Sequence, residues 1–184
     1  VLSDGAIRWI ATRGRIEFNG KGNPRRLRGV SIDITERKSA DEALRESEAR
    51  FHTMADTAPV MIWMADTDKL CTFFNKGWLD FTGRTLEQEL GHGWSEGVHR
   101  EDFDHCLENY VNSFNARQEF TMEYRLRRYD GEYCWVLDHG VPRFESDGKF
   151  VGYIGTAIDI TESKRAEKTL EKEREFLRQV IDID

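Results

Sequence analysis

The sequence predicts an α+β fold: a five-stranded antiparallel sheet with short helices on one face, flanked by N- and C-terminal linker helices. Two observations predict it. The central part of the chain contains patterns for two strands, several short helices and then three strands, an order typical of a sheet with its helices on one side. In addition, GTAIDITESK at residues 155–164 repeats GVSIDITERK at residues 29–38. A repeat at one fixed offset indicates successive copies of a structural module.

The repeat extends well beyond these ten residues at the same offset of 126 residues. Asp4-Gly5 falls on Asp130-Gly131, Trp9 on Trp135, Gly14 on Gly140, Phe18 on Phe144, Ala40 on Ala166 and Leu44 on Leu170. We therefore expect the chain to begin near the end of one module, contain a second, and stop just past it. The expected boundaries are 1–36 for the C-terminal strands of a preceding module, 37–50 for a helical linker, 51–162 for the complete module and 163–184 for a linker leading to a further module.

Composition excludes several classes of protein. The chain has 184 residues and a net charge of -7, and it contains no basic patch interleaved with aromatic residues, so we expect no nucleic-acid partner. No apolar run approaches the length needed to cross a bilayer, so we expect no membrane contact in this fragment. Cys71, Cys106 and Cys134 are odd in number and far apart. This usage fits reduced thiols and a cytoplasmic location.

The first 36 residues indicate a pair of strands. Ile7, Trp9 and Ala11 alternate with Arg8 and Ile10, a Gly-rich loop follows at 19–24, and Leu27–Ile34 has the second strand pattern. Two strands alone are marginally stable in water. We therefore expect this hairpin to pack on the neighbouring sheet or on a dimer partner.

Both linkers carry an apolar seam with heptad spacing. The first seam comprises Ala40, Leu44, Ser47, Phe51, Met54 and Ala58, and the second comprises Ala166, Leu170, Glu173, Leu177 and Val180. Thr35 and Thr161 precede these helices and are predicted N-caps. A single amphipathic helix and a parallel coiled-coil dimer both remain compatible with this pattern, because the seams are short and each has a polar interruption.

The central module contains clear patterns for each element. A helix at 101–115 carries apolar residues at one-face spacing, and alternation at 120–127 predicts a strand with one packed and one wet face. The remaining predicted elements are strands at 60–66, 70–75, 132–144 and 150–160, a helix at 76–81, and a short helix opened by a capping box at Thr85 and Gln88.

Four stretches carry a family resemblance: NKGWLDFTG at 75–83, residues 98–102, the Asp130-Gly131 to Trp135 segment, and GYIGTAIDITESKRAE from Gly152. Together they resemble a PAS domain with its C-terminal PAC motif, most closely the subclass found in bacterial and archaeal sensor histidine kinases of two-component systems. The resemblance covers 51–162, and residues 1–36 resemble the PAC part of a preceding PAS domain. It implies a non-catalytic sensor in which flanking helices pass a change to a downstream kinase or cyclase domain.

The resemblance also implies a candidate ligand pocket between the sheet and the long helix. The candidate residues are Trp63, Phe73, Asn75, Trp78, Cys106, Tyr110, Phe114, Tyr124, Trp135 and His139. Ligand pockets are apolar with a few placed polar groups, and Asn75, Tyr110 or His139 are candidates for that polar role. The alternative is that the rings simply fill the core. The sequence leaves both open, and a small-molecule ligand remains a possible partner.

No cofactor is required by the sequence. Flavin photochemistry would need a Cys in an Asn-Cys-Arg-Phe-type motif, and Cys106 lacks those neighbours. Haem would need an axial ligand such as His99 or His105, which fit a capping or surface role. With Glu101 and Asp102 these histidines match no metal-site template. The sequence therefore argues against haem, flavin and metal, and it shows no catalytic motif.

We expect the repeated stretch to act as an output joint. Asp159, Thr161 and Glu162 lie where the last strand meets the outgoing helix, and Asp33 and Thr35 occupy the same places in the first copy. The leading hypothesis is a sensory and signal-relay module of a larger protein, which can itself be membrane-attached, forming a homodimer through its linker helices. The alternatives are a ligand-free dimerisation scaffold and the sensor of a diguanylate cyclase.

Overall fold

The N-terminal part of the chain is a two-stranded antiparallel hairpin. The computed structural model describes residues 7–181, with side chains as far as Arg178, so Asp4, Gly5 and the side chain of Val180 lie outside the described residues. Strand β1 (Ile10–Phe18) pairs with β2 (Pro24–Asp33). Every residue of both strands is exposed. The predicted hairpin is therefore present, but its first strand begins at Ile10 and not at Ile7.

Two helices flank the central domain. Helix α1 (Thr35–Thr57) follows the hairpin, and α5 (Thr161–Ile181) follows the last strand. The seam residues Leu44 and Leu170 are exposed on them. Helix α1 ends before Ala58, so the first seam is one position shorter than predicted. Ala55 is buried in the last turn of α1, and its carbonyl oxygen accepts a hydrogen bond from the buried Asn75 of the central domain.

The central domain contains the predicted five-stranded antiparallel sheet. Its spatial order is β4-β3-β7-β6-β5. The strands are β3 (Met61–Ala65), β4 (Cys71–Phe74), β5 (Phe120–Arg127), β6 (Tyr133–Phe144) and β7 (Phe150–Asp159). The first two strands occupy one edge, and β7 returns to pair with β3 in the middle. In this order β7, the strand that leads into α5, lies between β3 and β6 and pairs with both.

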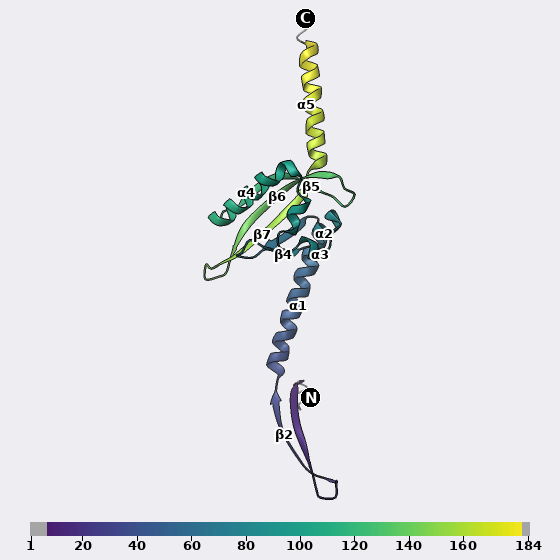
Figure 1. Ribbon diagram of the computed structural model, residues 1–184, viewed down its shortest axis with the longest axis vertical. Helices are drawn as coiled ribbons and strands as arrows, with labels where there is room; N and C mark the ends of the chain where they lie inside the picture. Colours follow the sequence, from purple (N-terminus) through teal and green to yellow (C-terminus); the bar gives the residue numbers. More distant parts are fainter. Residues whose placement is uncertain (1–6, 182–184) are drawn as a thin grey trace. The chain divides into compact units, whose positions relative to one another are not determined.

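The helices lie on one face of this sheet, as predicted. Between β4 and β5 the chain forms α2 (Lys76–Thr82), α3 (Leu86–Glu89), the 3-10 helix η1 (Gly93–Gly97) and α4 (Arg100–Ala116). Figure 1 shows α4 in teal lying along the green strands. The capping box of Thr85 and Gln88 is present at the start of α3. His99 caps α4 by accepting a hydrogen bond from the Glu101 N–H at 3.3 Å.

The core lies between the sheet and these helices because alternate strand residues point toward α4. On β5 the buried residues are Phe120, Met122, Tyr124 and Leu126, and the residues between them are exposed or half-buried. Helix α4 contributes Cys106, Tyr110 and Phe114 from its apolar face. This alternation fits a sheet covered on one face.

A pair of glycines leaves room for two large rings to pack against the middle of the sheet. Gly140 on β6 pairs with Gly155 on β7. The Phe120 ring covers Gly140 and the Trp63 ring covers Gly155, so that an added Cβ would lie 2.4 Å and 2.2 Å from those rings. The two rings stack with centroids 6.1 Å apart. Any larger residue at either glycine would push a ring out of the core.

No helix within residues 7–181 combines the length and apolar character needed to cross a bilayer. Three thiols, Cys71, Cys106 and Cys134, are all buried and unpaired with one another.

Candidate sensory core and output joint

A buried carboxylate lies at the centre of the core. Asp138 on β6 is 3% exposed. Its Oδ1 accepts a hydrogen bond from the Trp63 indole N–H at 2.9 Å, and its Oδ2 accepts one from the Tyr124 hydroxyl at 3.0 Å. Burial raises the pKa of Asp138 to about 6, although both hydrogen bonds oppose that rise. A carboxyl that changes charge near neutral pH is thus tied to two core rings.

Tyr110 of α4 joins the rings of the core to the rim of the domain. Its ring meets Trp63, Trp94 and Phe114 edge to face, with centroid distances between 5.7 and 6.0 Å. Its hydroxyl donates a hydrogen bond to the Lys69 carbonyl oxygen in the β3–β4 turn at 3.0 Å. A movement of this turn is therefore coupled to the position of the core rings.

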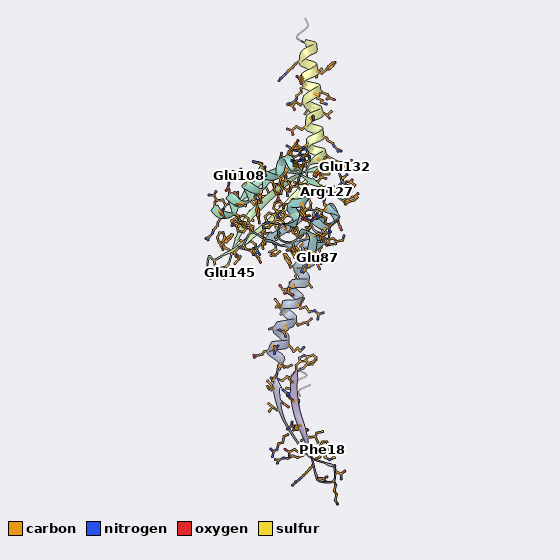
Figure 2. The ribbon with its side chains drawn as sticks, in the orientation of Figure 1. Phe18, Glu87, Glu108, Arg127, Glu132 and Glu145 are labelled. Carbon is orange, nitrogen blue, oxygen red and sulfur yellow. The ribbon has the colours of Figure 1, made fainter. Side chains whose placement is uncertain are left out.

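The space left among these rings is small. A cavity of about 10 Å³ is lined by Trp63, Cys71, Phe74, Trp78, Trp94 and Tyr110. That volume suits roughly one water molecule. Figure 2 shows the side chains crowded together within the central domain. In this conformation the rings fill the core, and an organic ligand enters only if one or more of them moves.

The buried thiols are unreactive in this environment. Burial raises the pKa of both Cys71 and Cys106 well above the usual range of a thiol. The sulfur of Cys106 lies 3.8 Å from the sulfur of Met122. A thiol held in its neutral form is a poor nucleophile, so Cys106 packs as a small apolar residue.

Six of the ten candidate pocket residues lie together in the core. They are Trp63, Trp78, Cys106, Tyr110, Phe114 and Tyr124, all buried. Asn75 is buried too, but its side chain holds the backbone together. Its Oδ1 accepts from the Ile62 and Trp78 N–H groups, and its Nδ2 donates to the Ala55 and Val60 carbonyls. With these bonds made, Asn75 has little capacity left for a ligand.

The other three candidates, Phe73, Trp135 and His139, lie outside the buried core cluster, and of all ten candidates only Trp63, Trp78 and Tyr110 line the small cavity. Trp135 and His139 lie an odd number of residues from the inward-facing Asp138 on β6, so strand alternation places them on the opposite face. Phe73 is half-buried next to Phe74, which takes the core position. Asp138 is the polar side chain that β6 places in the core, and the alternation of buried residues along β6 would have identified it.

A second buried acid, Glu89, was also missed by the sequence reasoning. It is 1% exposed, and its Oε1 lies 2.8 Å from Nε of Arg84. Burial raises the pKa of Glu89. Arg84 also donates to the Gln88 and Gly93 carbonyls and to Glu96. This pair fixes the loop that contains α3 and η1, and nothing in the sequence distinguishes it from the many surface charges around it.

The joint between β7 and α5 is held by local hydrogen bonds. The Thr161 hydroxyl accepts from the Trp135 N–H of β6 at 2.9 Å, and Asp159 Oδ1 accepts from the Thr161 N–H at 2.8 Å. The sequence predicted Thr161 as the N-cap of α5. Its hydroxyl instead accepts a hydrogen bond from β6 and so connects the start of the helix to the neighbouring strand. Glu162 is exposed in the first turn, where the helix dipole favours an acid.

The same bonds recur in the hairpin. The Thr35 hydroxyl accepts from the Trp9 N–H at 2.9 Å, and Asp33 Oδ1 accepts from the Thr35 N–H at 2.9 Å. Lys38 lies over the Trp9 ring at 5.8 Å, as Lys164 lies over the Trp135 ring at 5.7 Å. Thr35 is thus corrected in the same way as Thr161, and both joints have one construction.

Among the described residues, the second joint also has side-chain contacts that connect it, through β5, to helix α4. Arg125 of β5 lies over the Trp135 ring at 5.4 Å, and its guanidinium donates two hydrogen bonds to Asp102 of α4 at 2.7 and 2.8 Å. This partner lowers the pKa of Asp102. On the other side of the joint, Lys164 of α5 pairs with Glu123 of β5. Asp102 thus serves an ion pair, and a continuous set of contacts runs from α4 across β5 and β6 to α5.

The fold and this joint define a class: a small α+β sensory module with a ring-filled core and a helix leaving its last strand. Residues 72–157 match the sequence model of the family described as PAS fold. The structure also resembles the sensory box histidine kinase/response regulator of Burkholderia thailandensis, with a TM-score of 0.53 and 24% identity over 71% of this chain and 98% of that one. The central domain of this chain is therefore a PAS domain.

Curated relatives extend the likeness to the flanking segments. "Uncharacterized protein y4lL" of Sinorhizobium fredii is 41% identical over 90% of this chain and 20% of its own length. The peroxide stress-activated histidine kinase mak1 of Schizosaccharomyces pombe is 28% identical over 78% of this chain and 10% of its own. The "Probable diguanylate cyclase DgcE" of Escherichia coli is 27% identical over 89% of this chain and 15% of its own. This chain thus spans a fifth or less of each, and it is a PAS sensory domain of the kind found in signalling proteins.

Proposed function

We propose that this chain is a non-catalytic relay segment of a multidomain cytoplasmic sensor, with a histidine kinase as its output. It receives a ligand- or partner-induced change through α1 and passes it on through α5. The observation that carries this proposal is the joint, which is built twice with the same hydrogen bonds. Two identical joints before two helices indicate modules connected in series, each altering the helix that enters the next.

The contacts of the second joint supply a route for the signal. A movement of α4 acts on Arg125 through Asp102, and Arg125 shares the Trp135 ring with Lys164 of α5. The Thr161 hydroxyl ties the same helix to the backbone of Trp135. A shift of α4 relative to the sheet therefore changes both supports of α5. The core rings move with α4 because Tyr110 belongs to both.

The module boundaries follow from the same repeat. We infer that residues 1–36 end a preceding PAS domain, 37–50 link it to the PAS domain at 51–162, and 163–184 lead toward the next module. The exposed hairpin supports this inference, since Leu27 and Val30 are more than 60% exposed and need a cover. The exposed seam residues Leu44, Leu170 and Leu177 support a homodimer through the linker helices.

Two alternatives to a ligand-responsive relay with a histidine kinase output are a cyclase output and a ligand-free scaffold. The likeness to DgcE favours a cyclase output as a second candidate. The filled core favours a scaffold that only spaces and pairs helices, because the 10 Å³ cavity holds no organic ligand. The sequence of the full-length protein identifies the output domain. A dimer that survives dilution, isolated without any bound small molecule, supports the scaffold.

The joint is tested in the full-length protein by replacing Thr161 with Val. The variant keeps the shape of the side chain but removes the acceptor for the Trp135 N–H. We expect basal output to change about fivefold or more, the lower end of typical coupling between sites. Thr169→Val is the matched control, because Thr169 lies on the same helix and its hydroxyl bonds only to the Arg165 carbonyl. Equal output from both variants and the parent protein would refute the relay.

A further inference from the structure

A basic groove lies at the rim of the PAS domain, away from the ring-filled core. Its volume is about 500 Å³, and it is formed by the β3–β4 turn, the end of α4 and the β6–β7 turn. Glu145, labelled in Figure 2, begins the last of these turns. Each segment contributes one cation to the groove: Lys69, Arg117 and Lys149. Three positive charges from three separate segments thus converge in a domain whose chain is net negative.

Two of these cations belong to residues whose backbone has a positive φ, a conformation that non-glycine residues rarely adopt. Among residues 7–181, Lys69 and Arg117 are the two non-glycine residues with positive φ, at 70° and 53°. Arg117 is the left-handed C-cap that ends α4, and Lys69 lies in the β3–β4 turn, where its N–H donates to the Asp66 carbonyl at 3.0 Å. The backbone around Lys69 and around Arg117 is held by hydrogen bonds from two buried tyrosines, Tyr110 and Tyr153. Tyr110 donates to the Lys69 carbonyl. The single hydroxyl hydrogen of Tyr153 is shared between the Ser113 and Gln118 carbonyls, each 2.8 Å away and on either side of Arg117.

The floor of the groove positions the same two cations. Lys69 Nζ lies over the Phe114 ring at 5.5 Å, and the Arg117 guanidinium lies over the Phe150 ring at 5.1 Å. A ring face attracts a cation without neutralising it. Among the described residues, neither Lys69 nor Arg117 forms an ion pair with a carboxylate. Lys149 Nζ lies 3.9 Å from Oε1 of Glu145, a long ion pair.

The acids of the adjacent turns are partly engaged by their own backbone. Asp68 accepts a hydrogen bond from the Leu70 N–H at 3.0 Å, and Asp147 accepts one from the Lys149 N–H at 2.9 Å. Their charges lower the positive potential of the groove, so a monovalent anion gains little there. A ligand with two or more negative charges gains from all three cations at once.

We propose that this groove binds a small multivalent oxyanion, such as phosphate or a short dicarboxylate. Binding draws Lys69 and Arg117 toward the ligand. Because Tyr110 bonds to the Lys69 carbonyl and its ring touches Trp63 and Trp94, the core rings respond to occupancy. The groove is then an entry point for a stimulus. That consequence rests on the proposed relay function, whereas the binding itself does not.

The test titrates the 184-residue chain at constant ionic strength with inorganic phosphate, malonate and acetate, followed by calorimetry and tryptophan fluorescence. We expect saturable binding of phosphate or malonate, whichever chemistry the groove prefers, and none of acetate. Lys69→Asn and Arg117→Asn remove the charges but suit positive φ, since Asn tolerates this conformation. Each variant should fold normally and raise the half-saturating concentration about tenfold, as expected for one charge-assisted contact.

Arg100→Gln is the control, because it removes an exposed positive charge at the opposite end of the same helix. No saturable binding of either multivalent anion, or an equal weakening in Arg100→Gln, would overturn the proposal. The result is independent of the relay. Saturable binding in a protein whose Thr161→Val variant keeps normal output would uphold the groove and refute the joint.

Discussion

The hairpin β1–β2 and the strand pair β6–β7 share one register and one joint, but only the second pair has a buried face. Gly14 pairs with Gly29 as Gly140 pairs with Gly155. Leu27 is 71% exposed, whereas its counterpart Tyr153 is fully buried. The joint needs only two strands and a helix start, so it forms in both places. Burial needs the other three strands and α4, which only the second copy has among the described residues.

The largest difference between the two strand pairs is expected when Tyr153 and its counterpart Leu27 are each truncated to alanine. Tyr153→Ala leaves a cavity beside Phe114 and removes the bonds to the Ser113 and Gln118 carbonyls. We expect it to cost about 4 kcal/mol of unfolding free energy. Leu27→Ala, on an exposed strand, should change it by about 0.5 kcal/mol or less. Denaturant unfolding of the 184-residue chain measures both. A large loss for Leu27→Ala would show that the hairpin is covered in solution.

The second test compares Asp138 with Thr12, its counterpart in the hairpin. The pKa of Asp138 is raised from 3.8 to about 6, so the folded state keeps this proton to a higher pH than the unfolded state. The associated stability is present below pH 4 and is lost as the pH rises through 6. Relative to Asp138→Asn, the parent protein should lose up to about 3 kcal/mol over that window.

Thr12→Val is the matched variant, and it should introduce no pH dependence, because the Thr12 hydroxyl bonds only to that of Ser31 at the surface. Unfolding free energies at several pH values between 4 and 7 provide the measurement. Asp138→Asn can keep both partners, because the Tyr124 hydroxyl can turn to accept from the amide. A pH-independent difference between the parent and Asp138→Asn would contradict the raised pKa.

The smallest expected effect concerns the lysines of the two joints. Lys164 has both the Trp135 ring and Glu123, whereas Lys38 has the Trp9 ring. Lys164→Gln should accelerate amide hydrogen exchange in the first turn of α5, and Lys38→Gln should have less effect in α1. The ion pair is exposed, so 1 M salt should remove most of the difference. A difference that persists at 1 M salt would assign the effect to the ring contact.

The sequence predicted the fold well because its signals are local and periodic. The alternation of Phe120 to Leu126, the one-face spacing of α4 and the capping box at Thr85 each involve residues close in the chain. The repeat located both joints. The hydrogen bonds of Thr35 and Thr161 were misassigned because their partners, the Trp9 and Trp135 N–H groups, lie 26 residues away on another strand.

The candidate site was predicted less completely, since it depends on which face of β6 is buried. Assigning Trp135 and His139 to the pocket followed from their chemistry and ignored the strand period. Asp138 was overlooked because an acid is seldom fully buried. The Arg84–Glu89 pair and the groove at Lys69 and Arg117 bring together segments whose proximity no short-range pattern reports.

The glycine pair of the sheet has a consequence for how this sequence can change over time. Phe120 can accept a substitution at Gly140 only if its own ring becomes smaller, and Trp63 has the same relation to Gly155. A substitution at either glycine therefore requires a compensating substitution of the ring that covers it. The hairpin retains its own pair, Gly14 and Gly29, although none of the described residues places a ring over it.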